Sequence, residues 1–120
     1  ADALSLINTL TGMKIDINRR KFVLANKSGG MSGPAVKPVA VRMVYQTAQA
    51  VKLPIIGMGG VDSGAAAMEM MLAGASAVQV GAAIFTDPYA PVRIVEELQA
   101  LLEEQHIADV KEIIGAVKPW

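Results

Sequence analysis

The chain of 120 residues carries eleven basic and eleven acidic residues, so its formal net charge is zero and nothing in that balance points to nucleic acid or an acidic lipid surface. It has no cysteine, which excludes a disulfide framework, a thiolate metal site and a cysteine nucleophile from these residues. We expect one domain at most, and a hydrophobic share of 52% with a mean hydropathy of +0.40 is high for so small a domain.

Residues 64–85 look at first like a membrane span, but glycine and alanine dominate them and Glu69 and Gln79 interrupt them. The turn Gly74-Ala75-Ser76 divides the segment into a helix and a strand. A better explanation of the apolar composition is that these elements are buried in something larger. We therefore expect the chain to be a piece of a longer protein.

In the first third of the chain, the residue pattern predicts strands. Residues 3–8 form a short apolar strand, and residues 14–17 and 22–24 flank a basic turn in the manner of a small hairpin. The three basic residues 19–21 fit a nucleic-acid patch or a solvated hairpin tip, and the second interpretation is favoured. The glycine-rich residues 27–34 are interpreted as a loop that either covers a site or is mobile.

The remainder alternates helices with strands. Residues 36–51 keep the i, i+3, i+4, i+7 spacing of one apolar stripe, and residues 53–58 follow as a buried strand. A helix capped by Asp62 or Ser63, a strand over 76–80, a connector over 85–88, a helix over 89–105 and a short helix over 110–117 complete the chain. This order predicts βαβ units and a parallel sheet of three strands, too few to close a barrel.

Small-residue turns end two of these strands. Gly57-Met58-Gly59-Gly60 follows the first, and Gly81-Ala82-Ala83 follows the second. Glycine lets backbone N–H groups approach a ligand closely, and a helix start after the first turn adds free amides and a positive helix end. In (β/α)8 barrels the loops after the last two strands commonly bind phosphate, so the two turns predict a phosphate site.

Several motifs together resemble the dihydroorotate dehydrogenase family. They are SLINT at residues 5–9, GGMSGPAVKP at 29–38, PIIGMGG at 54–60 and AGASAVQVG at 73–81. The resemblance covers essentially the whole chain and is nearest to the C-terminal part of the NAD-linked, two-subunit branch. A lone GMGG would be weak evidence, because other phosphate-binding barrels share it. The run at 29–38 combined with residues 7–9 is far more specific.

The resemblance implies an α/β chain that forms the C-terminal portion of a (β/α)8 barrel, with residues 1–120 as part of a single FMN-binding domain. It implies oxidation of dihydroorotate to orotate, with hydride transfer to FMN, in pyrimidine biosynthesis. Asn8 and Thr9 would bind the substrate, and the cofactor-binding residues would be Ile7, Gly33, Gly59, Gly60, Gly81 and Ala82. Ala82 stands where relatives suggest threonine, which puts one hydroxyl contact to the phosphate in doubt.

The same resemblance places the catalytic base in the other half of the barrel, so no catalytic residue and no metal ligand is assigned here. It implies a cytoplasmic protein with a homodimeric arrangement, and it leaves open an iron–sulfur/FAD electron-transfer subunit and the electron acceptor. Two rival hypotheses remain: a non-catalytic phosphate-binding half-barrel, and another FMN or nucleotide barrel oxidoreductase, such as a pyrimidine-reducing domain. The only histidine, His106, is interpreted as a helix C-terminal residue rather than a catalytic one.

Overall fold

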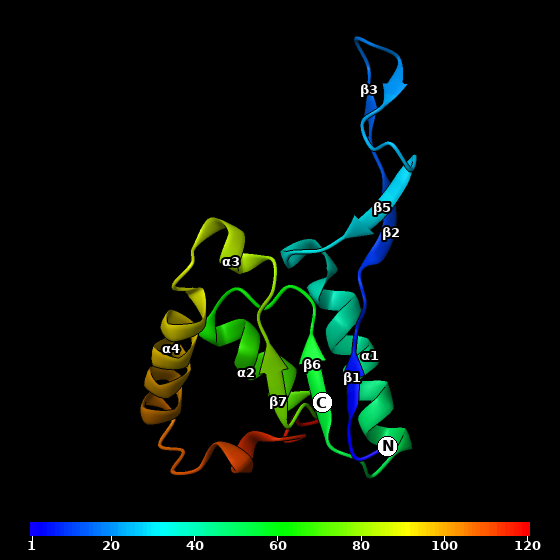
Figure 1. Ribbon diagram of the computed structural model, residues 1–120. Coiled ribbons are helices and arrows are strands. Elements are labelled where there is room, and N and C mark those ends of the chain that lie inside the picture. The colour runs from blue at the N-terminus through cyan, green and yellow to red at the C-terminus, as the bar shows by residue number, and fades with distance from the viewer.

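A computed structural model describes all residues from Ala1 to Trp120. Its centre is a three-stranded parallel sheet in the order β1 (Leu4–Leu6), β6 (Ile55–Met58), β7 (Ala77–Gln79) (Figure 1). Leu4 lies opposite Ile55 across the first pair of strands, and Ile56 lies opposite Ala77 across the second. All three strands point their carboxyl ends at the same edge of the sheet, as the sequence predicted for βαβ units.

Two helices cover one face of this sheet. The helix α1 (Lys37–Ala50) follows the 3-10 turn η1 (Pro34–Val36) and packs on β6, while α2 (Gly64–Leu72) packs on β7. Ala40 and Val44 from α1 and Met70 from α2 meet Ile55 in the main core. Gly57 permits this approach, because an added Cβ there would run into Met70 and Ala75.

The chain then passes through α3 (Ala83–Thr86) into α4 (Ala90–Glu104), which packs against α2 rather than on the sheet. The expected connector over 85–88 is therefore partly helical, which is a correction. Beyond α4 the 3-10 turn η2 (Val110–Ile113) buries Ile113 against Met68 and Met71, so the expected closing helix is shorter and tighter. No helix combines the length and the apolar character that a membrane crossing requires.

Residues 10–31 form an arm that projects from this body and makes the molecule 55 Å long against 32 Å across (Figure 1). At its base β2 (Leu10–Met13) pairs antiparallel with β5 (Ser28–Met31), and towards its tip β3 (Ile15–Asp16) pairs with β4 (Lys21–Phe22). The hairpin prediction is confirmed. The prediction of a loop at 27–34 is wrong for β5, because backbone pairing with β2 overrides the poor strand propensity of its two glycines.

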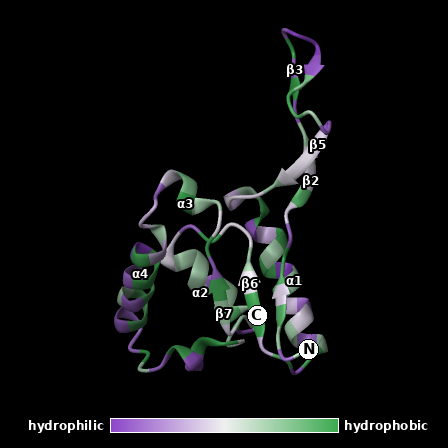
Figure 2. Cartoon of the chain, viewed as in Figure 1, coloured by the Kyte–Doolittle hydropathy of each residue, from purple (hydrophilic) through white to green (hydrophobic).

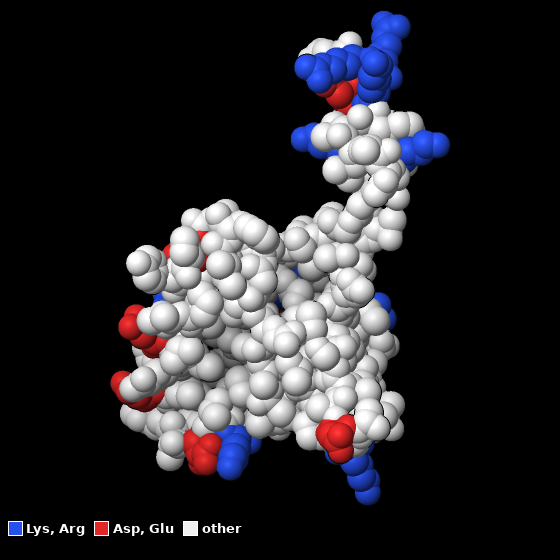
Figure 3. All heavy atoms as spheres, in the orientation of Figure 1, with Lys and Arg blue, Asp and Glu red and all other residues white.

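The arm and the body differ in surface chemistry. Green apolar segments alternate with purple polar ones along the arm without a covering layer (Figure 2). Basic side chains gather at its far end, and the middle of the body is largely free of charge on the face shown (Figure 3). The arm thus carries a strand pattern without a core of its own.

Candidate functional site

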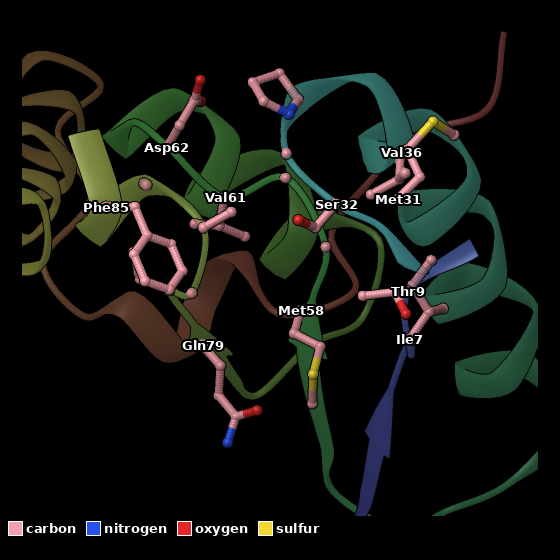
Figure 4. Close-up of a pocket in the computed structure, with 18 of the residues that line it drawn as sticks. Ile7, Thr9, Met31, Ser32, Val36, Met58, Val61, Asp62, Gln79 and Phe85 are labelled. Carbon is pink, nitrogen blue, oxygen red and sulfur yellow. The ribbon is translucent and has the colours of Figure 1, made fainter. Parts of the chain in front are cut away.

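A cleft of about 1010 Å³ opens where the three parallel strands end (Figure 4). Its walls come from the turn after β6, the turn after β7 and the segment that joins β5 to η1. All eight residues expected at a cofactor or substrate site line this one cleft: Ile7, Asn8, Thr9, Gly33, Gly59, Gly60, Gly81 and Ala82. The fold brings them together from four separate stretches of the chain.

The turn after β6 depends on glycine for its backbone shape. Gly59 has φ +121° and Gly60 has φ +75°, a region that residues with a Cβ rarely adopt. A Cβ on Gly60 would lie 2.8 Å from the carbonyl oxygen of Gly33 and 2.8 Å from Cβ of Lys37. A side chain at this position would therefore press against the start of α1 as well as strain the turn.

The turn after β7 also lacks large side chains, but its backbone shape does not require glycine. A Cβ added to Gly81 would meet no atom within 4 Å, and Gly81 is exposed without a positive φ. Ala82 follows as the residue before α3, and its methyl group can make no hydrogen bond. At this second turn of the cleft lining, a side chain would therefore meet open space rather than the body of the protein.

Four backbone N–H groups at these turns are free. Those of Gly59, Gly60, Gly81 and Ala82 donate no hydrogen bond to another residue of the chain. Half-buried N–H groups are normally paired, so the free ones of Gly59, Gly60 and Ala82, together with that of the exposed Gly81, fit an anion at this edge of the sheet. The cleft therefore has the donor set of a phosphate cradle.

The start of α2 does not add its first amides to this cradle, contrary to the expectation from the sequence. The Oγ of Ser63 accepts from the N–H of Ala66 at 3.1 Å, which confirms Ser63 as a cap. The Oε2 of Glu97 accepts from the N–H of Gly64 at 2.6 Å. Since α4 supplies this carboxylate, the positive end of α2 is already compensated from within the chain.

Asn8 and Thr9 lie between β1 and the arm, and both are exposed. The Oδ1 of Asn8 accepts from the backbone N–H of Thr9 at 2.7 Å and from its hydroxyl at 3.3 Å. Because these contacts occupy the oxygen, the Nδ2 group of Asn8 is the part of the amide that remains available. The pair therefore offers a hydrogen-bond donor to a ligand acceptor.

Apolar and neutral polar side chains form the rest of the cleft. Met58 and Gln79 are cross-strand neighbours on β6 and β7, and their side chains lie on the same side of the sheet (Figure 4). Phe85 from α3 is 93% exposed at the cleft. Such a lining suits a flat ring system, with a few polar groups to orient it.

Asp62 and Arg93 are the ionisable residues that line the cleft. The carboxylates of Glu97 and Asp87, bonded to the Arg93 guanidinium, raise its pKa above the ordinary value. The N–H of Gly64, and then Arg93, lower the pKa of Glu97. No group of three or more histidine, aspartate or glutamate side chains is arranged to hold a metal ion, and His106 lies beyond α4, away from the cleft.

Sequence reasoning missed several cleft residues, among them Ser32, Met58, Gln79, Phe85 and Arg93. Gln79 carried a usable signal, since it is a polar residue in an otherwise apolar strand end. For Arg93 the only sequence signal was the i, i+4 pair with Glu97 on one helix, because its partners at 62 and 87 belong to other segments.

A parallel sheet covered by helices, whose last two strands end in small-residue turns with free N–H groups, is the arrangement typical of the phosphate-binding side of (β/α)8 barrels. The comparisons with known proteins agree. Residues 1–102 match the family model for dihydroorotate dehydrogenase. The chain belongs to the dihydroorotate dehydrogenase family.

Individual relatives sharpen this placement. The chain is 62% identical over 118 residues to the catalytic subunit of dihydroorotate dehydrogenase B (NAD(+)) from Lachnoclostridium phytofermentans, covering 98% of this chain and 39% of that protein. It is 63% identical over 117 residues to the same subunit from Geotalea uraniireducens, covering 98% and 38%. A crystal structure of the Eimeria tenella dehydrogenase with ferulenol superposes with a TM-score of 0.78 at 28% identity, over 96% of this chain and 31% of that one.

The chain thus spans about two fifths of the length of the curated relatives that it matches. Its three parallel strands and their helices form the corresponding portion of the barrel, which confirms the predicted fold class.

Proposed function

We propose that the protein to which this chain belongs oxidises dihydroorotate to orotate at a bound FMN, and that residues 1–120 are the C-terminal part of one FMN-binding barrel domain. The observation that carries the proposal is the convergence of all eight expected residues on one cleft with free N–H groups. Membership of the dihydroorotate dehydrogenase family gives that cleft its chemistry.

The residues present fit the cofactor. Free N–H groups on two neighbouring turns suit a phosphate, and the bare Cα of Gly81 leaves room for it. Gly33 also faces open space, so its backbone is accessible to a ring system alongside Ile7 and Met58. When bound, FMN supplies the hydride acceptor.

The residues of this chain bind and orient rather than exchange protons. Asn8 would donate from Nδ2 to a carbonyl or carboxylate oxygen of the pyrimidine, while Thr9 holds the amide in that orientation through Oδ1. Ile7 is 6% exposed and packs in the main core, so it supports the strand end from which Asn8 projects. The proton acceptor would come from outside these 120 residues.

The partners are part of the same proposal. Relatives at about 60% identity are named catalytic subunits, which supports an additional electron-transfer subunit for this protein as well. We propose an iron–sulfur/FAD protein in that role and a homodimer of the catalytic subunit.

The direct test is anaerobic addition of dihydroorotate to the purified full-length protein, with the visible flavin band as the readout. We expect the band to bleach. In Asn8→Ala the flavin should stay bound, while kcat/KM falls about fivefold to 150-fold, because one substrate acceptor loses its donor at a cost of about 1–3 kcal/mol.

Asn18→Ala is the matched control, since Asn18 lies at the arm tip and its side chain makes no hydrogen bond within the chain. Flavin that binds but does not bleach would contradict the reaction and favour a non-catalytic phosphate-binding barrel. Normal kinetics in Asn8→Ala would remove Asn8 from the substrate site.

A further inference from the structure

Arg93 occupies an unusual position among the cleft residues, because it bonds one residue downstream of each glycine turn. Its Nη2 donates to the carbonyl oxygen of Asp62 at 3.2 Å, two residues beyond Gly60. Its Nε donates to Oδ2 of Asp87 at 3.0 Å, in the segment that follows the second turn. One guanidinium thus joins the residue that follows the first turn by two positions to the C-terminal end of α3, the short helix that follows the second turn.

The acceptors of this guanidinium are themselves fixed. Asp87 also accepts from the backbone N–H of Tyr89 at 3.0 Å through Oδ1, immediately before α4. Glu97 accepts from Nη1 of Arg93 at 2.8 Å and from the N–H of Gly64 at 2.6 Å. The cluster therefore joins Asp62, the start of α2 and the segment between α3 and α4 into one hydrogen-bonded unit.

The charge of Arg93 is compensated inside this cluster. Two carboxylates lie within 3.0 Å of its nitrogens, and its side chain is 42% exposed. Three of its N–H groups are directed to Asp62, Asp87 and Glu97. A planar fork can serve three acceptors at fixed angles, which a lysine ammonium does less well.

We propose that Arg93 is a positioning residue that holds the turns at 59–60 and 81–82 at the spacing of one phosphate group, and that it acts through Asp62 and Asp87 rather than as a ligand of the phosphate. This inference rests on the proposed FMN site. In this inference the free N–H groups bind the phosphate, and Arg93 sets the distance between the two turns that carry them.

The test compares FMN with riboflavin, which has the same ring but no phosphate. Apoprotein is prepared from the full-length wild type and from Arg93→Met, Arg93→Lys and Asp87→Asn, and both dissociation constants are measured by flavin fluorescence quenching. We expect FMN affinity to fall about tenfold or more in all three variants, since misplacing the cradle weakens at least one charge-assisted hydrogen bond. Riboflavin affinity should stay within about twofold of wild type, because its ring contacts are unchanged.

Arg42→Met is the matched control, because Arg42 is exposed on α1 and its side chain bonds only Gln46 on the same helix. It should preserve both dissociation constants. If the Arg93 variants do not fold, Asp87→Asn still decides the matter, since it keeps the arginine and weakens the connection.

Three results would overturn the inference. FMN binding that is kept or tightened in Asp87→Asn, but lost in Arg93→Met, would make Arg93 a direct phosphate ligand released from its carboxylate. Equal losses for FMN and riboflavin would give Arg93 a general structural role. Unchanged FMN binding in every variant would show that Arg93 has no role in the phosphate site. Failure of the proposed function looks different: the wild type itself would show no preference for FMN over riboflavin.

Discussion

Every buried residue of the chain lies in the body, whereas the arm of residues 10–31 contains none, although it carries seven exposed large apolar side chains. Ile55 and Met70 in the body are almost completely enclosed, but Ile17 in the arm is 84% exposed. The two regions have similar residue types and different surroundings. Apolar content therefore does not by itself produce a core; a second packed layer is needed, and only the body has one.

The two regions also supply different residues of the cleft. The glycine turns are anchored by α1, α2 and α4, while Asn8 and Thr9 stand at the junction of β1 with the arm. Gly30 of β5 packs so closely against Thr9 that an added Cβ would collide with its side chain. The base of the arm thus holds the residues proposed to bind substrate, and the body holds those proposed to bind phosphate.

The largest expected effect is on stability, and it tests whether only the body has a packed core. Met70→Ala should destabilise the full-length protein by about 2–5 kcal/mol, because it leaves a cavity beneath Gly57. Ile17→Ala should change the free energy of unfolding by less than about 0.5 kcal/mol, as exposed substitutions usually do. Urea denaturation measures both. Comparable losses would show that another surface covers the arm.

A second comparison substitutes one glycine in each region. Gly60→Val should cost about 1–3 kcal/mol from the strained φ alone, with more from the contact with Gly33 and Lys37. Gly12→Ala in the arm should be near neutral, since its Cβ would lie 3.7 Å from Cβ of Met31. Thermal unfolding measures the pair. A fully stable Gly60→Val protein would contradict the tight packing of this turn.

Removing a helix cap should have a smaller effect. Ser63→Ala takes away the acceptor for the N–H of Ala66, and we expect a loss of about 1 kcal/mol. Ser63→Asp should restore most of it, because aspartate caps helices equally well. Equal stability of the alanine and aspartate proteins in urea denaturation would contradict a capping role.

The smallest effect is a pH dependence confined to the body. The pKa of Glu97 lies below its ordinary value of 4.5, so its contribution to stability is complete above that pH and is lost as pH falls towards the lowered pKa. Glu97→Gln should flatten the stability profile in that acid range. Since solvent reaches the half-buried carboxylate and screens it, the change should be small but measurable as a difference in urea midpoint. Parallel profiles of wild type and variant would contradict the lowered pKa.

Much of the body was predictable because its pattern is local. The apolar spacing over 36–51 predicted α1, whose buried residues are Ala40 and Val44, while Val36 is buried in the preceding turn η1. Small-residue turns after two apolar strands predicted where the cleft would lie. What the pattern could not show was what an added side chain would meet at each turn: the start of α1 at Gly60 and open space at Gly81.

The arm and the Arg93 cluster were harder because non-local contacts decide them. β5 contains two glycines and no β-branched residue, and it is a strand only because β2 pairs with it. Arg93 and Asp62 are 31 residues apart in sequence, and the α2 start that Glu97 reaches is 33 residues away. No periodicity connects such positions, so the compensated start of α2 was mistaken for part of the phosphate site.

The central claim is that the free N–H groups of the two turns bind the phosphate of FMN, and Gly81→Val tests it most directly. The valine side chain would project into open space, so it should fill the cradle without disturbing the fold. We predict a folded protein with unchanged riboflavin affinity and FMN affinity reduced by more than about a hundredfold, the effect of losing two charge-assisted hydrogen bonds. A folded Gly81→Val protein that binds FMN as tightly as wild type would place the phosphate elsewhere.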